Sequence, residues 1–311
     1  MGSADLDKFS ISVVIPSRNE TDRLLKTLTS IDSNRSGETN VDIVVVDDNS
    51  EIPVKQLLSN FSISTSINVV RSESRQGVPV SRNIGCQAAT GEILVITDSH
   101  VKFSKGWDQL ILPHVDSNRI LVGSIVSKPK FKACGCRLVV PHMGTWWNGK
   151  TPFELDPIQV APCSATIIPR KLFESLGGYD NGMRLYGAAE PEFSVRAWLS
   201  GAEILALPEF ELEHEFKNKQ QRIEWLEEHR TDMVHNGIRF GLLYLSKKEI
   251  LRMIRHYAMK FPAHMQDASK LLSDSDVWEK RAKLRESLKY NFEWYINKFS
   301  LNNQIGQPIF K

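Results

Sequence analysis

The stretch Ile93-Leu94-Val95-Ile96-Thr97-Asp98-Ser99-His100 decides the fold. Its four consecutive aliphatic residues predict a strand that is buried on both faces, as in a parallel sheet. The strand is followed by a carboxylate, Asp98, and an imidazole, His100, which share one side because residues i and i+2 of an extended segment point the same way. Open α/β sheets bind ligands at this carboxyl edge. The stretch therefore predicts either a divalent metal site or a capped strand end with a solvent-facing histidine.

Three more predicted strands surround this stretch. Residues 11–15, 41–46 and 67–70 are apolar, and leucines at helical spacing follow the first of them. Strands that alternate with helices in this way predict an α/β fold with a mostly parallel sheet flanked by helices. Polar residues follow each strand, and they are Asn19, Asp47, Asp48, Arg71, Asp98 and His100. Parallel strands end along one rim, so we expect these polar groups to form a single site.

Length, charge and cysteine usage restrict the class of protein. The 311 residues suffice for one large domain with an extension, and a formal charge of +2 gives no basic excess for nucleic acid. No window reaches the roughly 18 apolar residues of a membrane span. The start has no signal-peptide core, so we expect a cytoplasmic protein, and the alternative is a piece cut from a longer protein. Zinc-site spacing is absent, and we expect reduced structural thiols at Cys86, Cys134, Cys136 and Cys163.

The sequence lacks the two common glycine-rich motifs that hold phosphates. Neither Gly-x-Gly-x-x-Gly nor Gly-x-x-x-x-Gly-Lys-Ser/Thr occurs, so a dinucleotide fold or a P-loop is not predicted. A nucleotide would need a bridging metal and arginines such as Arg71, Arg75 or Arg82 for charge neutralisation. Asp47 or Asp48 could accept a hydrogen bond from a base or a ribose. The alternatives are solvated arginines and turn-forming aspartates.

Several motifs follow one another in a set order. They are Val13-Val14-Ile15-Pro16 with Arg18-Asn19-Glu20, residues 45–50, residues 77–85 and residues 91–100. Together they resemble the nucleotide-binding half of a GT-A glycosyltransferase of the family 2 superfamily. The Asp-Ser-His variant at 98–100 resembles the polypeptide N-acetylgalactosaminyltransferases. Residues 165–173, 177–180 and 182–198 are similar to acceptor-side motifs, and an ordered set is more specific than a single motif.

The resemblance implies which residues bind the donor nucleotide: Pro16, Arg18, Glu20, Asp47, Asp48, Arg82 and Asp98. The first three would line the base pocket. One of the two adjacent aspartates would contact the uracil or the ribose, and Arg82 would face the nucleotide. Asp98 would act through a metal on the diphosphate of a UDP-sugar.

Two histidines and one aspartate form the metal site that the resemblance implies. Asp98 and His100 would hold Mn²⁺ or Mg²⁺. In the polypeptide-transferase relatives a further histidine, followed by an aromatic and a basic residue, completes the site. His214, in His214-Glu215-Phe216-Lys217, fits that pattern, and the alternative is a plain surface histidine. We predict that Asp98, His100 and His214 bind one ion.

The acceptor half contains two candidate catalytic carboxylates. Residues 186–198 look like the acidic motif that opens a helix in the family, with Glu190 where inverting relatives usually have an aspartate. An inverting transferase needs a carboxylate that takes the acceptor's proton, whereas retaining relatives do not. The sequence therefore leaves the stereochemistry open. Glu192 is the second candidate, and it also fits an ion pair with Arg196 at i+4.

Two adjacent tryptophans, Trp146 and Trp147, lie between the halves. The glycine-flanked stretch 142–150 predicts a loop. In such a loop the pair would form a lid or a sugar platform. The alternative is a core anchor.

The composition changes after residue 217 to charged helices. One of these helices has an apolar stripe at helical spacing, which consists of Ile250, Leu251, Ile254, Tyr257, Ala258 and Phe261. The same helix carries the basic residues Lys247, Lys248, Arg252, Arg255, His256 and Lys260. A solvated basic face is the default prediction, and contact with a membrane surface or with phosphate is the alternative.

The predicted organisation is a catalytic domain over residues 9–216 and a helical extension over 217–311. The catalytic domain would divide into a nucleotide-binding half, 9–100, and an acceptor half, 101–216. The predicted function is a metal-dependent glycosyltransferase that transfers a hexosyl group from a UDP-sugar to a soluble peptide, protein or small molecule. The alternatives are a sugar-nucleotide hydrolase or nucleotidylyltransferase on the same fold, and a non-catalytic nucleotide-sugar-binding protein.

Overall fold

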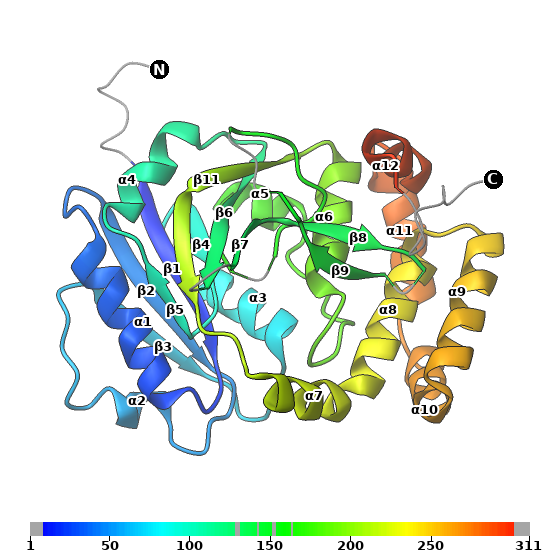
Figure 1. The fold of residues 1–311 in the computed structure, drawn as a ribbon, viewed down its shortest axis with the longest axis horizontal. Helices are drawn as coiled ribbons and strands as arrows, with labels where there is room; N and C mark the ends of the chain where they lie inside the picture. Colours follow the sequence, from blue (N-terminus) through cyan, green and yellow to red (C-terminus); the bar gives the residue numbers. More distant parts are fainter. Residues whose placement is uncertain (1–8, 128–130, 142, 151–153, 163, 302–311) are drawn as a thin grey trace.

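A computed structural model describes residues 9–127, 131–141, 143–150, 154–162 and 164–301. Figure 1 shows a curled central sheet with helices packed around it, and helices α8 to α12 gathered at one end. The strands are β1 Ser10–Ser17, β2 Asn40–Asp47, β3 Ser66–Arg71, β4 Ile93–Ile96, β5 Val101–Phe103, β6 Arg119–Ser127, β7 Phe131–Cys134, β8 Cys136–Val139, β9 Gly144–Trp147, β10 Thr166–Pro169 and β11 Glu203–His214.

Helices fill most of the connections and the whole C-terminal part. In the N-terminal part they are α1 Thr21–Asn34, α2 Val54–Leu57, α3 Val78–Ala88, α4 Trp107–Ile111 with a 3-10 turn at Leu112–His114, α5 Arg170–Ser175 and α6 Ala189–Ser200. The C-terminal helices are α7 Lys219–Glu228, α8 Arg230–Tyr244, α9 Lys247–Lys260, α10 Pro262–Ser273, α11 Val277–Ser287 and α12 Phe292–Phe299.

The main sheet is parallel in its N-terminal half and mixed beyond it. Its order within the described residues is β3-β2-β1-β4-β10-β6-β11-β5, with β7 added to β6. The first four strands in that order are parallel neighbours, as predicted. Strand β10 then runs antiparallel to both β4 and β6, and β5 antiparallel to β11. The predicted α/β fold class is confirmed, and the short strands β5, β7 and β10 add the antiparallel part.

The central strands are buried on both faces, as the aliphatic runs predict. Val14, Val46 and Leu94 belong to one apolar cluster, whereas Val13 and Val45 belong to the cluster on the other face. This division follows from the two-residue period of a strand. A Cβ at Gly85 would lie 2.4 Å from Cγ1 of Val14. Helix α3 therefore needs glycine there to pack closely on β1.

The C-terminal helices share one core with the acceptor half of the sheet. A single apolar cluster includes Val195 of α6, Phe240 of α8 and Tyr295 of α12. The fully buried guanidinium of Arg239 in α8 donates to both carboxylate oxygens of Asp180, at 2.8 and 3.0 Å. The predicted boundary at residue 217 therefore divides a continuous packed interior.

We expect a fragment of residues 9–216 to show no cooperative thermal unfolding by circular dichroism. Truncation would expose the shared apolar cluster and leave Asp180 without Arg239 and Lys280, which lies 2.8 Å away. Removing one partner of a buried ion pair costs about 3–5 kcal/mol, a large part of a typical 5–15 kcal/mol stability. The fragment 9–301 is the control and should unfold cooperatively. A 9–216 fragment that melts cooperatively near the full-length midpoint would show two independent domains.

The predicted loop around the tryptophan pair is wrong. Gly144–Trp147 is strand β9, which pairs antiparallel with β8. Alternation along this strand separates the two rings. Trp147 packs edge-on against Phe131, whereas Trp146 is 49% exposed beneath the guanidinium of Arg137. The core-anchor alternative thus describes Trp147, and Trp146 alone is available as a platform.

The described cysteines are free, buried thiols. Burial raises the pKa of Cys134 to about 11, so its reactive thiolate is scarce at neutral pH. Cys86 and Cys136 are likewise buried and free, which agrees with the predicted structural role, and Cys163 lies outside the described residues. Within the described ranges, every helix is too short or too polar to cross a bilayer.

Candidate functional site

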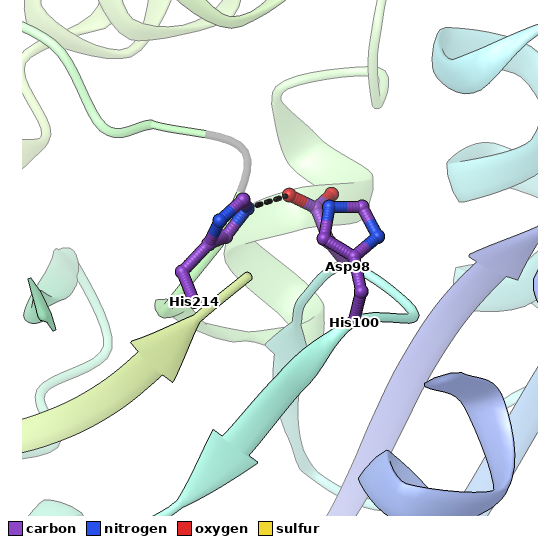
Figure 2. Close-up of side chains that lie close together, drawn as sticks. All are labelled: Asp98, His100 and His214. Carbon is purple, nitrogen blue, oxygen red and sulfur yellow. Dashed lines mark hydrogen bonds and ion pairs between the residues drawn. The ribbon is translucent and has the colours of Figure 1, made fainter. Parts of the chain in front are cut away.

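Three side chains from distant parts of the sequence converge at one end of the sheet. Asp98 follows β4, His100 precedes β5, and His214 is the last residue of β11. One ligand-type atom from each lies within 4.8 Å of those from the other two. Figure 2 shows both imidazole rings beside the Asp98 carboxylate. The antiparallel pairing of β11 with β5 sets His214 opposite Val101, which places it next to His100.

The carboxylate of Asp98 is held in its ionised form. Burial alone would raise the pKa of Asp98, but the hydrogen bond with His214 and the charges of His100 and Arg82 outweigh it and hold that pKa well below its usual range. The hydroxyl of Ser164 also donates to Asp98 Oδ2 at 2.5 Å. For His100, burial comes first and lowers the pKa, which favours the neutral imidazole. An ionised carboxylate and a neutral imidazole are the forms that bind metal.

The residues at this place fit a divalent ion. The Nδ1 atoms of His100 and His214 are buried, and neither has a hydrogen-bond partner within 3.5 Å among the described residues. A buried nitrogen without a partner costs free energy, which ligation of an ion by the imidazoles would offset. One carboxylate oxygen with two imidazole nitrogens is a mixed donor set that suits Mn²⁺ and related metals. The predicted trio is thus together in space.

Arg82 links the metal group to the acceptor half. Its buried guanidinium donates to Glu190 Oε1 at 2.6 Å and lies 3.5 Å from Asp98 Oδ1. Arg82 lies in α3 and Glu190 in the first turn of α6, so this ion pair joins the two helices. This arrangement places the Glu190 carboxylate one side chain away from Asp98.

Glu192 lies on the other side of the same helix. Its carboxylate is fully buried, pairs with Arg196 at 2.9 and 2.8 Å, and accepts a hydrogen bond from the Tyr244 hydroxyl at 2.6 Å. Residues two apart in a helix point about 200° away from each other, so Glu190 and Glu192 cannot share one site. The ion-pair alternative for Glu192 is what the structure contains, and we retain Glu190 alone as the candidate.

The adjacent aspartates Asp47 and Asp48 bind the protein's own backbone. Asp47 accepts from the amides of Ser50 and Val54 at 2.8 and 3.0 Å and pairs with Arg71. Asp48 accepts from the amides of residues 76 and 77 at 2.6 and 2.9 Å. These bonds fix the loops after β2 and before α3. A contact of either aspartate with uracil or ribose stays a prediction.

A cavity of about 200 Å³ lies at the carboxyl ends of β1 and β2. Of the three residues predicted for a base pocket, Glu20 lines it and also lies 3.6 Å from His100 Nδ1. Pro16 and Arg18 do not line the cavity, and Arg18 instead donates to the carbonyls of residues 48 and 49 at 2.9 and 2.7 Å. The remaining lining residues are Ser17, Asn19, Thr21, Leu24, Ser50, Glu51, Ile52, Val54 and Leu57.

Two features beside the metal group were not predicted. Ser164 is the first, and no sequence pattern distinguishes it from other serines. The second is an aromatic wall around Phe216. The centroid of the Phe216 ring lies 4.3 Å from that of His214, 5.4 Å from that of Phe131 and 6.4 Å from that of Trp147. The two-residue spacing of His214 and Phe216 could have indicated this second feature. The wall covers one side of the metal group with apolar surface.

Comparison with protein families identifies the chain. The family model described as glycosyl transferase family 2 matches residues 12–176, just over half of the 311 residues. The chain belongs to glycosyl transferase family 2. The matched part contains Arg82, Asp98 and His100, whereas Glu190 and His214 lie beyond it. The resemblance seen in the sequence motifs is thereby confirmed.

Curated proteins similar to this chain are named polypeptide N-acetylgalactosaminyltransferases. The chain is 30% identical over 235 residues to polypeptide N-acetylgalactosaminyltransferase 8 of Drosophila melanogaster. The alignment covers 70% of this chain and 40% of that protein. It is 26% identical over 323 residues to polypeptide N-acetylgalactosaminyltransferase 11 of Xenopus tropicalis, and that alignment covers 96% of this chain and 51% of that protein. The chain thus spans about half the length of these relatives.

A solved structure has the same fold, and the likeness extends beyond the segment that the family model matches. The crystal structure of GalNAc-T7 with UDP, GalNAc and Mn²⁺ superposes with a TM-score of 0.75 at 21% sequence identity. The alignment covers 94% of this chain and 56% of that chain. Because it reaches over nearly the whole molecule, the likeness includes helices of the C-terminal part as well as the sheet.

Proposed function

We propose that the protein is a metal-dependent glycosyltransferase that transfers a sugar from a UDP-sugar to a hydroxyl acceptor. The observation that carries this proposal is the convergence of Asp98, His100 and His214 beside Arg82, in a chain of glycosyl transferase family 2. In such a transfer the bond from the anomeric carbon to the diphosphate breaks, a bond to the acceptor oxygen forms, and the acceptor's proton leaves. UDP is the second product.

In this proposal Asp98, His100 and His214 hold the metal, with Mn²⁺ as the first choice. A bound divalent ion would neutralise charge on the diphosphate leaving group. Arg82 holds Asp98 and Glu190 in place through its two ion pairs. Glu20, beside the cavity at the ends of β1 and β2, is proposed to face the nucleotide. The aromatic wall around Phe216 gives the metal group one apolar side.

We propose a peptide or protein as the first acceptor class to test and UDP-N-acetylgalactosamine as the first donor. The support is the naming of the curated relatives as polypeptide N-acetylgalactosaminyltransferases. A small-molecule acceptor is the second class.

Cytoplasmic localisation stays a prediction, which fluorescence microscopy of a tagged full-length protein would test.

Mn²⁺-dependent release of UDP from a panel of UDP-sugars tests the proposed function. We expect release to require both Mn²⁺ and an acceptor, and mass spectrometry to show the acceptor heavier by one sugar. Release to water with no modified acceptor would indicate a sugar-nucleotide hydrolase. Tight Mn²⁺-dependent UDP binding without turnover on any donor would indicate a non-catalytic binding protein.

We expect Glu190→Gln to lower kcat by about 100-fold while leaving the Kd for UDP with Mn²⁺ within a few-fold. A general base contributes about 10²–10⁴ in rate, and glutamine keeps the hydrogen bond to Arg82 but removes the charge. Steady-state kinetics and calorimetry measure the two quantities. The control is Glu203→Gln, which alters an exposed carboxylate paired with Arg119 on β6.

Unchanged kcat in Glu190→Gln would remove this residue from the chemistry. The NMR signal of the product's anomeric proton gives its configuration. Inversion together with the loss of kcat in Glu190→Gln would assign Glu190 as the base, whereas retention would restrict its role to holding Arg82 and the acceptor.

A further inference from the structure

Helix α9 exposes a surface that the proposed transfer does not use. Figure 1 places this helix at the edge of the C-terminal bundle, where it packs on α8 and α10. The sequence predicted that Leu251 and Ala258 belong to its buried stripe, and the structure corrects this, because both are exposed. The buried residues of the helix are Glu249, Met253 and Tyr257, of which the predicted stripe contained Tyr257.

The exposed face of α9 combines cations with apolar side chains. At 100° per residue, its members fall within an arc of about 140°. They are Lys247, Lys248, Leu251, Arg252, Arg255, Ala258 and Met259. Leu251 is 61% exposed and Met259 79% exposed. The four cations and Leu251 line one open hollow on this face. We refer to these seven residues as the α9 face.

In the part of the chain that the structure describes, no carboxylate neutralises the charge of the α9 face. Among the described residues, Lys247, Lys248, Arg252 and Arg255 have no carboxylate within 4.0 Å. The one acidic residue of the helix, Glu249, is buried and accepts hydrogen bonds from the amide and hydroxyl of Ser246 at 3.2 and 2.6 Å. The face therefore has four positive charges and no exposed acid.

We propose that the α9 face binds the surface of an anionic lipid bilayer. Cations interleaved with exposed apolar residues on one helix face are the pattern of an interfacial helix, whose apolar groups enter the headgroup boundary while its cations meet lipid phosphates. A second copy of this chain does not fit, because two such faces would repel each other. A polyanion such as nucleic acid would neutralise the cations but leave Leu251 and Met259 in water. The proposal does not depend on the donor chemistry.

Co-sedimentation of the full-length protein with vesicles tests the proposal. We expect binding to phosphatidylglycerol vesicles, none to phosphatidylcholine vesicles, and weakening as salt rises. The variant Lys248→Gln/Arg252→Gln/Arg255→Gln should partition about 100-fold less, since each cation near an anionic surface contributes about five-fold. The matched control Lys102→Gln/Lys171→Gln/Lys283→Gln removes the same charge from exposed sites on three other elements and should bind as the wild type does.

The double variant Leu251→Ser/Met259→Ser tests the apolar part. It should bind phosphatidylglycerol at low salt and dissociate at a salt concentration where the wild type stays bound. Binding by the wild type to neither vesicle, or equal binding by the triple α9 variant and its control, would overturn the proposal. The proposal would also be overturned if heparin displaced the protein completely from the vesicles and the double variant bound as strongly as the wild type. That result would assign the face to soluble polyanions.

Discussion

Replacing Asp98 by alanine is expected to abolish Mn²⁺-dependent binding of UDP and, with it, turnover. Asp98 contributes the carboxylate of the metal group, and its charge also holds His100, His214 and Arg82 around the same point. Loss of a residue that hydrogen-bonds a metal ligand lowers metal affinity or activity by about 10–100-fold. Loss of a ligand itself should therefore lower the affinity by more than about 100-fold. The same result is expected for His214→Ala.

Calorimetric titration of UDP with and without Mn²⁺ measures the loss directly. A second readout is the Mn²⁺-induced rise in Tm, which follows from binding to the folded state and should vanish in both variants. His114→Ala is the control, because His114 lies on the surface beside Glu209 at 3.4 Å and outside the metal group. If both variants bound UDP and Mn²⁺ as the wild type does, the metal assignment would be wrong. Circular dichroism should confirm that both variants remain folded.

The second large effect is expected on stability, from Arg196→Ala. This substitution leaves the fully buried Glu192 without its bidentate partner and leaves the carbonyls of residues 176 and 178 without the guanidinium donor. Removing one partner of a buried ion pair costs about 3–5 kcal/mol. Urea unfolding followed by circular dichroism should show this loss as a lower midpoint with an unchanged slope.

An exposed pair of the same spacing supplies the matched control. Glu279 and Lys283 are also four residues apart in a helix, lie 2.7 Å apart and are largely exposed. Lys283→Ala should leave the unfolding midpoint within error, because a solvated pair contributes little. An equally small shift for Arg196→Ala would contradict a structural role for the Glu192 pair and return Glu192 to the candidate catalytic residues.

Most of the N-terminal half could be predicted from the sequence. The aliphatic runs of β1, β2 and β4 are buried on both faces, and such runs occur mainly in parallel sheets. The antiparallel additions could not be predicted in this way. Strand β5 has only three residues, which is too short for a reliable period. Both β5 and β10 pair antiparallel with strands from distant parts of the chain, and no local pattern specifies that pairing.

In the C-terminal part, the sequence predicted where a helix lies but not which of its sides is buried. The apolar stripe of α9 was predicted from helical spacing, yet Leu251 lies on the exposed side and Met253 on the buried one. Periodicity locates a helix and its approximate stripe. The direction in which the stripe faces depends on α8 and α10, against which the helix packs. A one-residue change in that orientation rotates the buried face by about 100°.

The sequence by itself determined the parallel core, the pairing of Asp98 with His100, and the family. These features are local, because a strand's two-residue period and an i, i+2 spacing act over a few residues. The tertiary structure decided that His214 joins them through the β11–β5 pairing, that Glu190 faces Arg82, and that Glu192 is buried in an ion pair. The first two outcomes depend on contacts between residues 116 and 108 apart in the sequence. The ion pair of Glu192 with Arg196 is a local i+4 contact, but its burial under Tyr244, 52 residues away, depends on packing, because no local pattern specifies which side of a helix another element will cover.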